Sequence, residues 1–293
     1  MYVGCMRQTG ASAGDAVPPG IQARNGLCRL PVFRPVALKM VKLLADEEAA
    51  VPGVAGLLRS DPGLSAEVLA LANSAFYGKA YPVDSLARAI LVLGFERTRS
   101  LTLTVSLRSF TRHLTNTKVM EGCWRHSLAT ALLAEELAPL YEVSKDQAYM
   151  AALMHDVGRL GLLMAYGDRY APVLETRHNA LADCLESERG LFQMDHCQAG
   201  LWLTQQWGFP PEYSRVAGCH HEELSGSQRD LASLTRVACL LADALGFPAV
   251  ALAQAPSTAE IVAQLPAKPW NPYVLSEEDL KSRIGRQVAT VEC

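Results

Sequence analysis

The amino-acid sequence predicts an all-α protein built from two helical lobes. Apolar residues recur at intervals of three and four along most of the 293 residues, which is the spacing of one buried helix face. Alternating runs of Val, Ile, Thr and Tyr, which would indicate strands, are scarce. Short connections rich in Gly, Pro and polar residues separate the periodic segments, as is typical of packed helices.

Residues 1–29 are predicted to form a flexible tail. They contain no compact apolar stretch with a basic flank and a small-residue cleavage site, so no secretory signal is predicted. No window of the sequence reaches the roughly 18 uninterrupted apolar residues that a membrane-spanning helix needs. We therefore expect a soluble protein in the cytoplasm.

The N-terminal lobe is predicted at residues 30–114. In SDPGLSAEVLALANSAFYG, Asp61 can cap a helix and Pro62 suits its first position. We expect this helix to end near Asn73, which caps or turns the chain. The stretch DSLARAILVLGFERTRSLTLTVSLRSF predicts two helices hinged at Gly94, because glycine readily takes the left-handed conformation that closes a helix.

The second lobe is predicted at residues 115–248, after the polar break TRHLTNTKV. Helices are expected near residues 120–140, 145–165, 168–187, 195–207, 210–221 and 229–246. Residues 249–293 are expected to form a linker and one amphipathic helix, in SEEDLKSRIGRQV, which covers a lobe or a partner.

The composition argues against nucleic acid or a membrane surface as a partner. The 27 basic and 30 acidic residues leave a net charge of −3 and are spread along the chain, so no long-range field attracts DNA or anionic lipid. The eight cysteines form no C-x-x-C pair, which argues against a zinc knuckle or a dense disulfide framework. We expect reduced thiols.

Most of the histidines lie in apolar helical segments of the second lobe, such as CWRHS, ALMHDVG and GCHHEE. His113 and His178 lie in polar stretches and are expected at the surface. The residues in apolar segments are His126, His155, His196, His220 and His221, and the acids Asp156 and Asp243 occupy segments of the same kind.

Each of these residues, taken singly, is more often a hydrogen-bonded core residue than a ligand. Together they indicate a metal, because burying so many imidazoles and carboxylates without partners costs several kcal/mol per ionised group. A divalent cation removes that cost by making the buried groups its ligands.

Imidazole and carboxylate donors without thiolate suit iron or manganese better than structural zinc. Seven donors are too many for one tetrahedral ion, so we expect a dinuclear Fe or Mn site with Asp156 as the bridge. Two ions roughly 3.5–4 Å apart activate water against a phosphodiester. Glu188 is either an outer partner that orients an imidazole or a solvated residue at a helix end.

The order of these residues resembles two groups of known enzymes. His126, the pair His155–Asp156 and the distant Asp243 resemble the HD superfamily of metal-dependent phosphohydrolases. His196 and the pair His220–His221 resemble its HD-GYP branch, which hydrolyses cyclic di-GMP with a metal pair. The resemblance implies that the first group holds one ion and that the second group completes the site of another.

The strings DPGLSAEVLALANSAFYG and SLARAILVLGF, followed by CWRHS, ALMHDVGRLG and WGFPPEYSRVAGCHH, strongly resemble the HDOD family. This family is a helical signalling output domain of bacteria, and its members have commonly lost parts of the metal site. The resemblance covers roughly residues 30–246. It implies action through a signalling protein partner that reads the surface of the N-terminal lobe.

Two departures from the HD-GYP pattern leave two functions open. The Gly-Tyr-Pro stretch reads EELSGSQRD here, and the lysine after the HD pair is Arg159, which can hold a phosphate bidentately. The first function is a signalling output protein with a structural or regulatory metal. The alternative is a phosphodiesterase acting on a cyclic dinucleotide or another phosphoester, with Asp156 and Arg159 as its catalytic residues.

Overall fold

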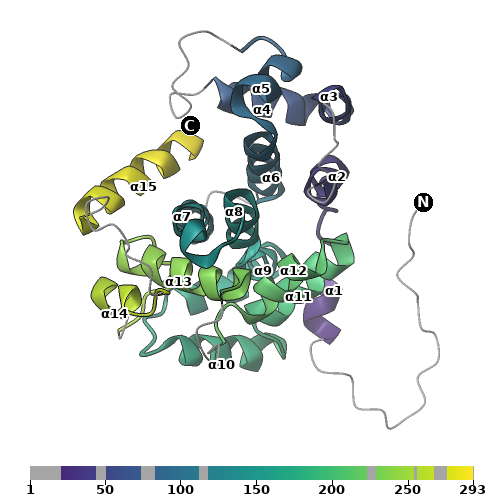
Figure 1. Cartoon of the computed structure of the whole chain (residues 1–293). Coiled ribbons are helices and arrows are strands. Elements are labelled where there is room, and N and C mark those ends of the chain that lie inside the picture. The colour runs from purple at the N-terminus through teal and green to yellow at the C-terminus, as the bar shows by residue number, and fades with distance from the viewer. Residues whose placement is uncertain are drawn as a thin grey trace, which may run out of the picture.

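The protein is all-α, as the apolar periodicity predicts (Figure 1). The computed structural model describes residues 21–43, 51–73, 83–111, 118–222, 229–253, 256–266 and 276–292. Within these ranges the chain forms helices and no strand, and one isolated β-bridge joins His178 to Leu252. None of the described helices is long and apolar enough to cross a membrane.

The predicted tail is helical in part. Residues 1–20 lie outside the described residues, but helix α1 (Ile21–Leu27) follows them directly. Ala23 and Leu27 are each 2% exposed, and α1 packs against α9 (Val157–Glu175). Burial of this small apolar face explains why the segment is ordered although its sequence shows no long periodic pattern.

Five helices after α1 surround a small core of their own. They are α2 (Pro35–Lys42), α3 (Val51–Arg59), α4 (Pro62–Ala72), α5 (Leu86–Leu93) and α6 (Phe95–Thr111). Leu58, Leu64 and Ile90 lie at the centre of this core. In Figure 1, α3, α4 and α5 form one end of the molecule, and α6 runs from them toward α8 (Lys145–Met154).

The helix boundaries in this part lie at the residues that the sequence analysis predicts as caps and turns. Asp61 caps α4, since its Oδ1 accepts from the Leu64 N–H at 3.0 Å. Gly94 separates α5 from α6 with φ of 84°, which a residue without Cβ adopts at little cost. Asn73 follows α4, and its side-chain amide donates to the Val83 carbonyl while its Oδ1 accepts from the Val83 N–H. All three predictions are confirmed.

The remaining helices form the larger part of the molecule. They are α7 (Lys118–Tyr141), α8, α9, α10 (Leu181–Phe192), α11 (His196–Trp207), α12 (Pro211–Cys219), α13 (Leu231–Ala244), α14 (Thr258–Val262) and α15 (Glu277–Glu292). The predicted C-terminal amphipathic helix is confirmed as α15. It packs against α7 and buries Leu280, Ile284 and Val288 in the main core.

Two predicted helices of the second half are each interrupted. The one expected over residues 145–165 divides into α8 and α9 at His155 and Asp156. The one expected over residues 168–187 is wrong: α9 continues to Glu175, the chain is then non-helical to Ala180, and α10 begins at Leu181. The sequence stays apolar across the first break, so periodicity alone does not reveal it. The second break coincides with the polar stretch TRHNA.

His178 lies in the second of these breaks, and the prediction that it is a surface residue is wrong. It is 8% exposed, its Nε2 lies 2.8 Å from the Val173 carbonyl, and its backbone bonds to Ala251 and Ala253. The polar sequence around it does not reveal this, because its backbone partners come from a segment some seventy positions later. His113 lies outside the described residues.

Gly158 allows α9 to approach α11 more closely than any other residue would. A Cβ at position 158 would lie 1.9 Å from the His196 carbonyl oxygen and 2.3 Å from the Gly200 amide nitrogen. Both atoms belong to backbone, so a small side-chain movement does not relieve the overlap. This contact fixes the start of α11, where His196 is located.

We predict that Gly158→Ala lowers the free energy of unfolding by about 3 kcal/mol or more, because two helices must separate. Gly167→Ala is the matched control in the same helix, since a Cβ there meets nothing within 4 Å. The control should change stability by less than about 1 kcal/mol. Urea unfolding midpoints measure both, and equal effects of the two substitutions would contradict the close-approach argument.

A buried ion pair joins α6 to α8. Arg99 Nη2 lies 2.7 Å from Asp146 Oδ2, and the Ser100 hydroxyl donates to Asp146 Oδ1. Burial raises the pKa of Asp146 to about 6, although Arg99 and Ser100 act to lower it. The folded state therefore favours the protonated carboxyl more than the unfolded chain does.

We predict a pH dependence of stability that originates at Asp146. Its contribution is fully present below pH about 4, where the unfolded chain is also protonated, and is lost as pH rises through about 6. The difference in unfolding free energy between the natural chain and Asp146→Asn should therefore shift by about 3 kcal/mol from pH 4 to pH 7, toward relative destabilisation of the natural chain. A difference that stays constant over this range would contradict the prediction.

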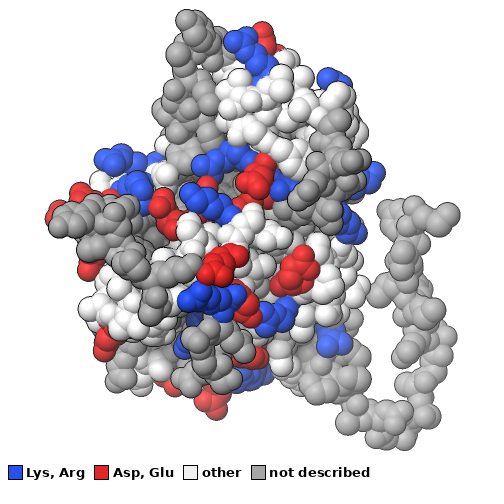
Figure 2. Space-filling model, in the orientation of Figure 1, with Lys and Arg blue, Asp and Glu red and all other residues white. Residues whose placement is uncertain are grey.

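The charged surface is mixed in sign. Figure 2 shows Lys and Arg side chains interspersed with Asp and Glu among the described residues of this face. Pairs such as Arg215–Asp230 and Arg229–Glu142 bring opposite charges into contact. The described residues of this face therefore present no continuous surface of one sign.

Candidate metal centre

Five imidazoles that the sequence singles out lie together inside the larger part of the molecule. Neighbouring ring centroids are between 4.0 and 5.5 Å apart. The predicted residues and their positions are His126 on α7, His155 and Asp156 between α8 and α9, His196 at the start of α11, His220 and His221 after α12, and Asp243 on α13.

The junction between α8 and α9 places two adjacent donors in the interior. His155 ends α8 in helical conformation, and Asp156 then leaves it with φ of −100° and ψ of 16°. The Asp156 carbonyl accepts from the Arg159 and Leu160 amides, which starts α9 at once. Because the change of direction takes one residue, both side chains stay buried, at 0% and 1% exposure.

Protein acceptors fix the orientation of four imidazoles through their Nδ1 atoms. His126 Nδ1 lies 2.8 Å from the Phe247 carbonyl, and His155 Nδ1 lies 2.5 Å from the Ala152 carbonyl. His196 Nδ1 lies 2.7 Å from Glu188 Oε2, and His220 Nδ1 lies 3.2 Å from the Ala217 carbonyl. A hydrogen on Nδ1 satisfies each acceptor and leaves the Nε2 lone pair directed into the cluster, as in metal-binding histidines.

Two of the Nε2 atoms face each other at a distance that requires a hydrogen or a cation between them. His126 Nε2 and His155 Nε2 are 3.3 Å apart. Two lone pairs this close repel unless a proton or a cation lies between them. Burial holds the pKa of His155 well below the usual value, whereas Cys239 and Asp243 hold that of His126 well above it against the effect of burial. A hydrogen on His126 Nε2 that donates to His155 therefore satisfies the pair in the metal-free protein, and a cation can take its place.

Asp156 and His220 contain a second pair of unsatisfied atoms. Asp156 Oδ1 and His220 Nε2 are 3.6 Å apart, both are buried, and neither has a hydrogen-bond partner. Buried polar atoms without partners are rare and usually mark a bound ion or a functional group. Cys197 and Asp156 raise the pKa of His220 to about 9 against the effect of burial, so a proton on His220 Nε2 can face Asp156 in the metal-free protein. A cation that contacts both atoms removes the cost of burying them in the same way.

Arg159 occupies the other side of Asp156. Its Nε donates to Asp156 Oδ2 at 2.8 Å, and its Nη2 donates to His196 Nε2 at 3.0 Å. The side chain is 2% exposed. The guanidinium is the main cause that holds the pKa of Asp156 well below its usual range, against the effect of burial.

The Glu188 carboxylate accepts hydrogen bonds from His196 and Tyr170 and lies beside the Arg159 guanidinium. It is fully buried, and its Oε2 accepts from both the backbone N–H and the ring of His196. Arg159 Nη1 lies 3.6 Å from its Oε1, to which the Tyr170 hydroxyl also donates. Burial acts to raise the pKa of Glu188, but His196 and Arg159 lower it to about 2. Of the two roles left open by the sequence, Glu188 has that of orienting an imidazole.

Asp243 contacts the opposite edge of His126. Its Oδ1 lies 3.2 Å from His126 Nδ1, not from the Nε2 that faces His155. The side chain is 21% exposed, unlike the buried donors. In this geometry Asp243 and the Phe247 carbonyl orient His126 together.

Sequence reasoning missed two cysteines that lie beside the cluster. Cys239 Sγ is 3.5 Å from His126 Nε2, and Cys197 Sγ is 3.6 Å from His196 Nε2. The search for C-x-x-C pairs could not find them, because each thiol stands alone among imidazoles. Cys197 follows His196 directly, and this adjacency was the available signal.

The donor atoms form overlapping groups that fit metal binding. Three sets each lie within 4.8 Å: His126, His155 and Cys239; His155, Asp156 and His220; and His196, Cys197, His220 and His221. The first two sets share His155, and the second contains the Asp156 and His220 atoms that lack hydrogen-bond partners. The third contains His196, whose Nε2 already accepts from Arg159. The second set, His155, Asp156 and His220, therefore offers three donors to one cation next to a guanidinium.

Residues 30–223, about two thirds of the chain, match the family model of the HDOD domain. The chain belongs to the HDOD family. A search of curated proteins found no match.

Three solved structures share the fold of this HDOD protein. An HDOD domain protein of unknown function from Geobacter sulfurreducens has a TM-score of 0.69 at 22% identity, over 92% of this chain and 93% of that one. A protein from Shewanella amazonensis SB2B, provisionally named a phosphohydrolase, has a TM-score of 0.67 at 19% identity, over 93% of this chain and 97% of that one. A protein from Marinobacter aquaeolei VT8, provisionally named a signal transduction protein, has a TM-score of 0.66 at 20% identity, over 92% of this chain and 63% of that one.

We predict strong energetic coupling between Asp156 and Arg159 in the metal-free protein. Asp156→Ala leaves a buried guanidinium short of one partner and should cost about 3 kcal/mol of stability. The double variant Asp156→Ala/Arg159→Met should be more stable than Asp156→Ala alone. A double-mutant cycle should give a coupling free energy between the two residues above about 1 kcal/mol. Unfolding curves measured with a chelator test this, and additive effects would show that the pair is not a unit.

Proposed function

We propose that this HDOD protein is a signalling output module whose cluster binds one divalent cation in a structural or regulatory role. The observation that carries the proposal is the placement of Arg159. Its guanidinium contacts Asp156 Oδ2 and His196 Nε2 and lies beside Glu188. A second metal ion would need Asp156 Oδ2 and His196 Nε2 as ligands.

A dinuclear site needs Asp156 to bridge two ions with its two oxygens. Only Oδ1 is without a hydrogen-bond partner, because Oδ2 accepts from Arg159 at 2.8 Å. The guanidinium is a permanent cation, so it neutralises this side of Asp156 without a second metal. His155, Asp156 and His220, whose donor atoms all lie within 4.8 Å of one another, are the residues that would hold the single ion.

Burial of the cluster also supports a non-catalytic role. His155, His196 and His220 are each 0% exposed, and Arg159 is 2% exposed. A phosphodiester must reach both the nucleophile and the cations in order to react. In this conformation Arg159 points into the protein and holds carboxylates, so it is not presented to an external phosphate.

The N-terminal helices supply a surface for a partner. On α5, Leu91 is 71% exposed and Val92 is 41% exposed. Exposed large aliphatic side chains of this kind are typical of protein contact sites when they cluster. We propose that a signalling protein reads this lobe.

A metal-dependent phosphohydrolase is the second candidate, and the convergence of Nε2 atoms favours it. A bound divalent ion supplies Lewis acidity and lowers the pKa of water. In this function Asp243, His196 and His221 would also serve as ligands, and Arg159 would leave Asp156 to hold a phosphate. A solved neighbour provisionally named a phosphohydrolase adds support.

Metal content and turnover of bis(p-nitrophenyl) phosphate separate the two functions. We predict one ion per chain after reconstitution with iron, manganese or zinc, and hydrolysis no faster than that of His155→Ala. The His155→Ala variant should lose the ion, whereas His178→Ala, which removes a buried histidine outside the cluster, should keep it. Two ions per chain with turnover that His155→Ala abolishes would establish the phosphohydrolase instead.

A further inference from the structure

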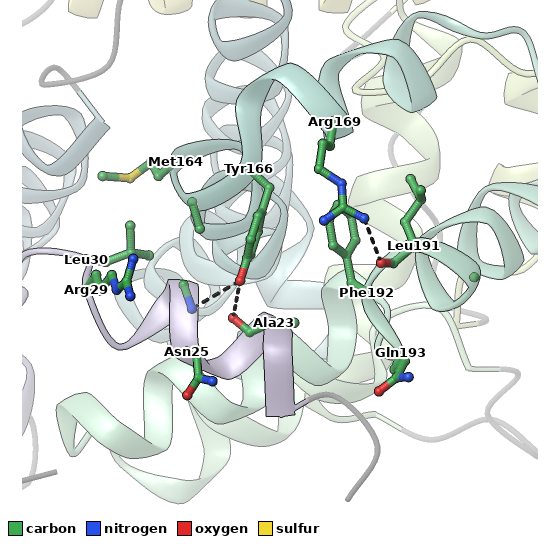
Figure 3. A pocket seen from close by; sticks show the side chains of 13 residues that line it. Ala23, Asn25, Arg29, Leu30, Met164, Tyr166, Arg169, Leu191, Phe192 and Gln193 are labelled. Carbon is green, nitrogen blue, oxygen red and sulfur yellow. Dashed lines mark hydrogen bonds between the residues drawn. The ribbon is translucent and has the colours of Figure 1, made fainter. Parts of the chain in front are cut away.

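A cavity of about 680 Å³ lies on the surface between α1, the middle of α9 and the end of α10 (Figure 3). Its volume is within the range of small-molecule sites, about 300–1,000 Å³. It is separate from the buried imidazoles: none of its lining residues belongs to the candidate metal centre.

The backbone is irregular where it borders this cavity. Tyr166 interrupts α9 with φ of −143° and ψ of 34°, and Gln193 ends α10 with φ of 56°. Among the described non-glycine residues, only Gln193 and Glu142 have positive φ. Unusual backbone of this kind concentrates at functional sites.

Tyr166 fixes the wall formed by α1. Its hydroxyl accepts from the Gly26 N–H at 3.1 Å and donates to the Ala23 carbonyl at 3.2 Å. A Cβ at Gly26 would lie 2.3 Å from this hydroxyl, so the contact needs glycine. Figure 3 shows the Tyr166 ring standing between Arg29 on one side and Arg169 on the other.

The charges of the cavity suit an anion. Arg29 and Arg169 both line it, and none of the described residues that line it is acidic. Within the part of the chain that the structure describes, neither arginine makes an ion pair with a carboxylate. Arg169 instead lies over the Phe192 ring, 5.7 Å from its centroid, with Nη2 3.4 Å from the Leu191 carbonyl.

An apolar surface lies between the two charges. Met164, Tyr166 and Phe192 line the same cavity, and the two aromatic centroids are 5.3 Å apart. Arginine fits phosphate oxygens bidentately. Aromatic and guanidinium faces stack on planar rings.

We propose that this cavity binds a phosphorylated ligand with a planar ring, of the size of a nucleoside diphosphate, with Arg29 and Arg169 on its phosphates.

The position of the cavity also allows a bound ligand to regulate the signalling module. Gly190 of the cavity lies two residues after Glu188, and Tyr170, one turn after Tyr166, donates to Glu188. A ligand here thus contacts the two helices that hold the Arg159–Glu188–His196 network.

Calorimetry with ADP, inorganic pyrophosphate and adenosine tests the proposal on the full chain as purified. We expect ADP to bind, and Arg29→Gln and Arg169→Gln each to weaken it about tenfold or more, since each removes charge-assisted hydrogen bonds. Both side chains are exposed, so the variants should fold. Arg24→Gln, an exposed arginine of α1 outside the cavity, is the matched control and should not change the affinity.

Pyrophosphate and adenosine test separately the phosphate contacts and the ring contacts of the proposed ligand. Pyrophosphate should bind about tenfold more weakly than ADP, because it lacks a ring to stack, and adenosine should bind more weakly still. Equal affinity for pyrophosphate and ADP would overturn the ring contact. Absence of ADP binding, or binding that survives both arginine substitutions but is lost in His155→Ala, would overturn the cavity as its site.

Discussion

The buried guanidinium of Arg159 is the constraint on which the interior of this protein depends. It lies between the carboxylates of Asp156 and Glu188 and donates to the His196 ring. Two carboxylates without it would each bear the cost of burial, which is several kcal/mol for an unpaired ion. With it, the positions of α9, α10 and α11 are coupled through one charge. The remaining unsatisfied atoms lie on the opposite side of Asp156, and they define where a cation fits.

The candidate metal-ligating side chains of the cluster lie mostly at helix ends. The pairs His155–Asp156 and His220–His221 both follow the last residue of a helix, and His196 begins one. At such ends a carbonyl of the preceding turn is available, and the Ala152 and Ala217 carbonyls accept from the histidine rings. Backbone therefore fixes ring orientation without further side chains. The same solution appears twice, which explains why the adjacent donor pairs stand out in the sequence.

The sequence predicts the helical class and the gathering of the imidazoles, because apolar periodicity and histidines in apolar segments are local signals. It does not predict the roles within the cluster. Arg159 was expected to meet phosphate, yet it pairs with Asp156 three residues away, and only the fold shows that Glu188 and His196 complete its surroundings. Cys197 and Cys239 carry no motif, and His178 is buried by a distant segment. Asp243 is near His126 as expected, but the edge of the ring that it contacts depends on how α13 packs against α7. Such outcomes depend on long-range packing, which local patterns do not encode.

Locating the ions by anomalous scattering from crystals grown with iron or manganese tests the central claim most directly. The account predicts a single ion bound by His155, Asp156 and His220, with the guanidinium of Arg159 still on the other oxygen of Asp156. Two ions bridged by Asp156, with Arg159 displaced from it, would contradict the account and restore the dinuclear site.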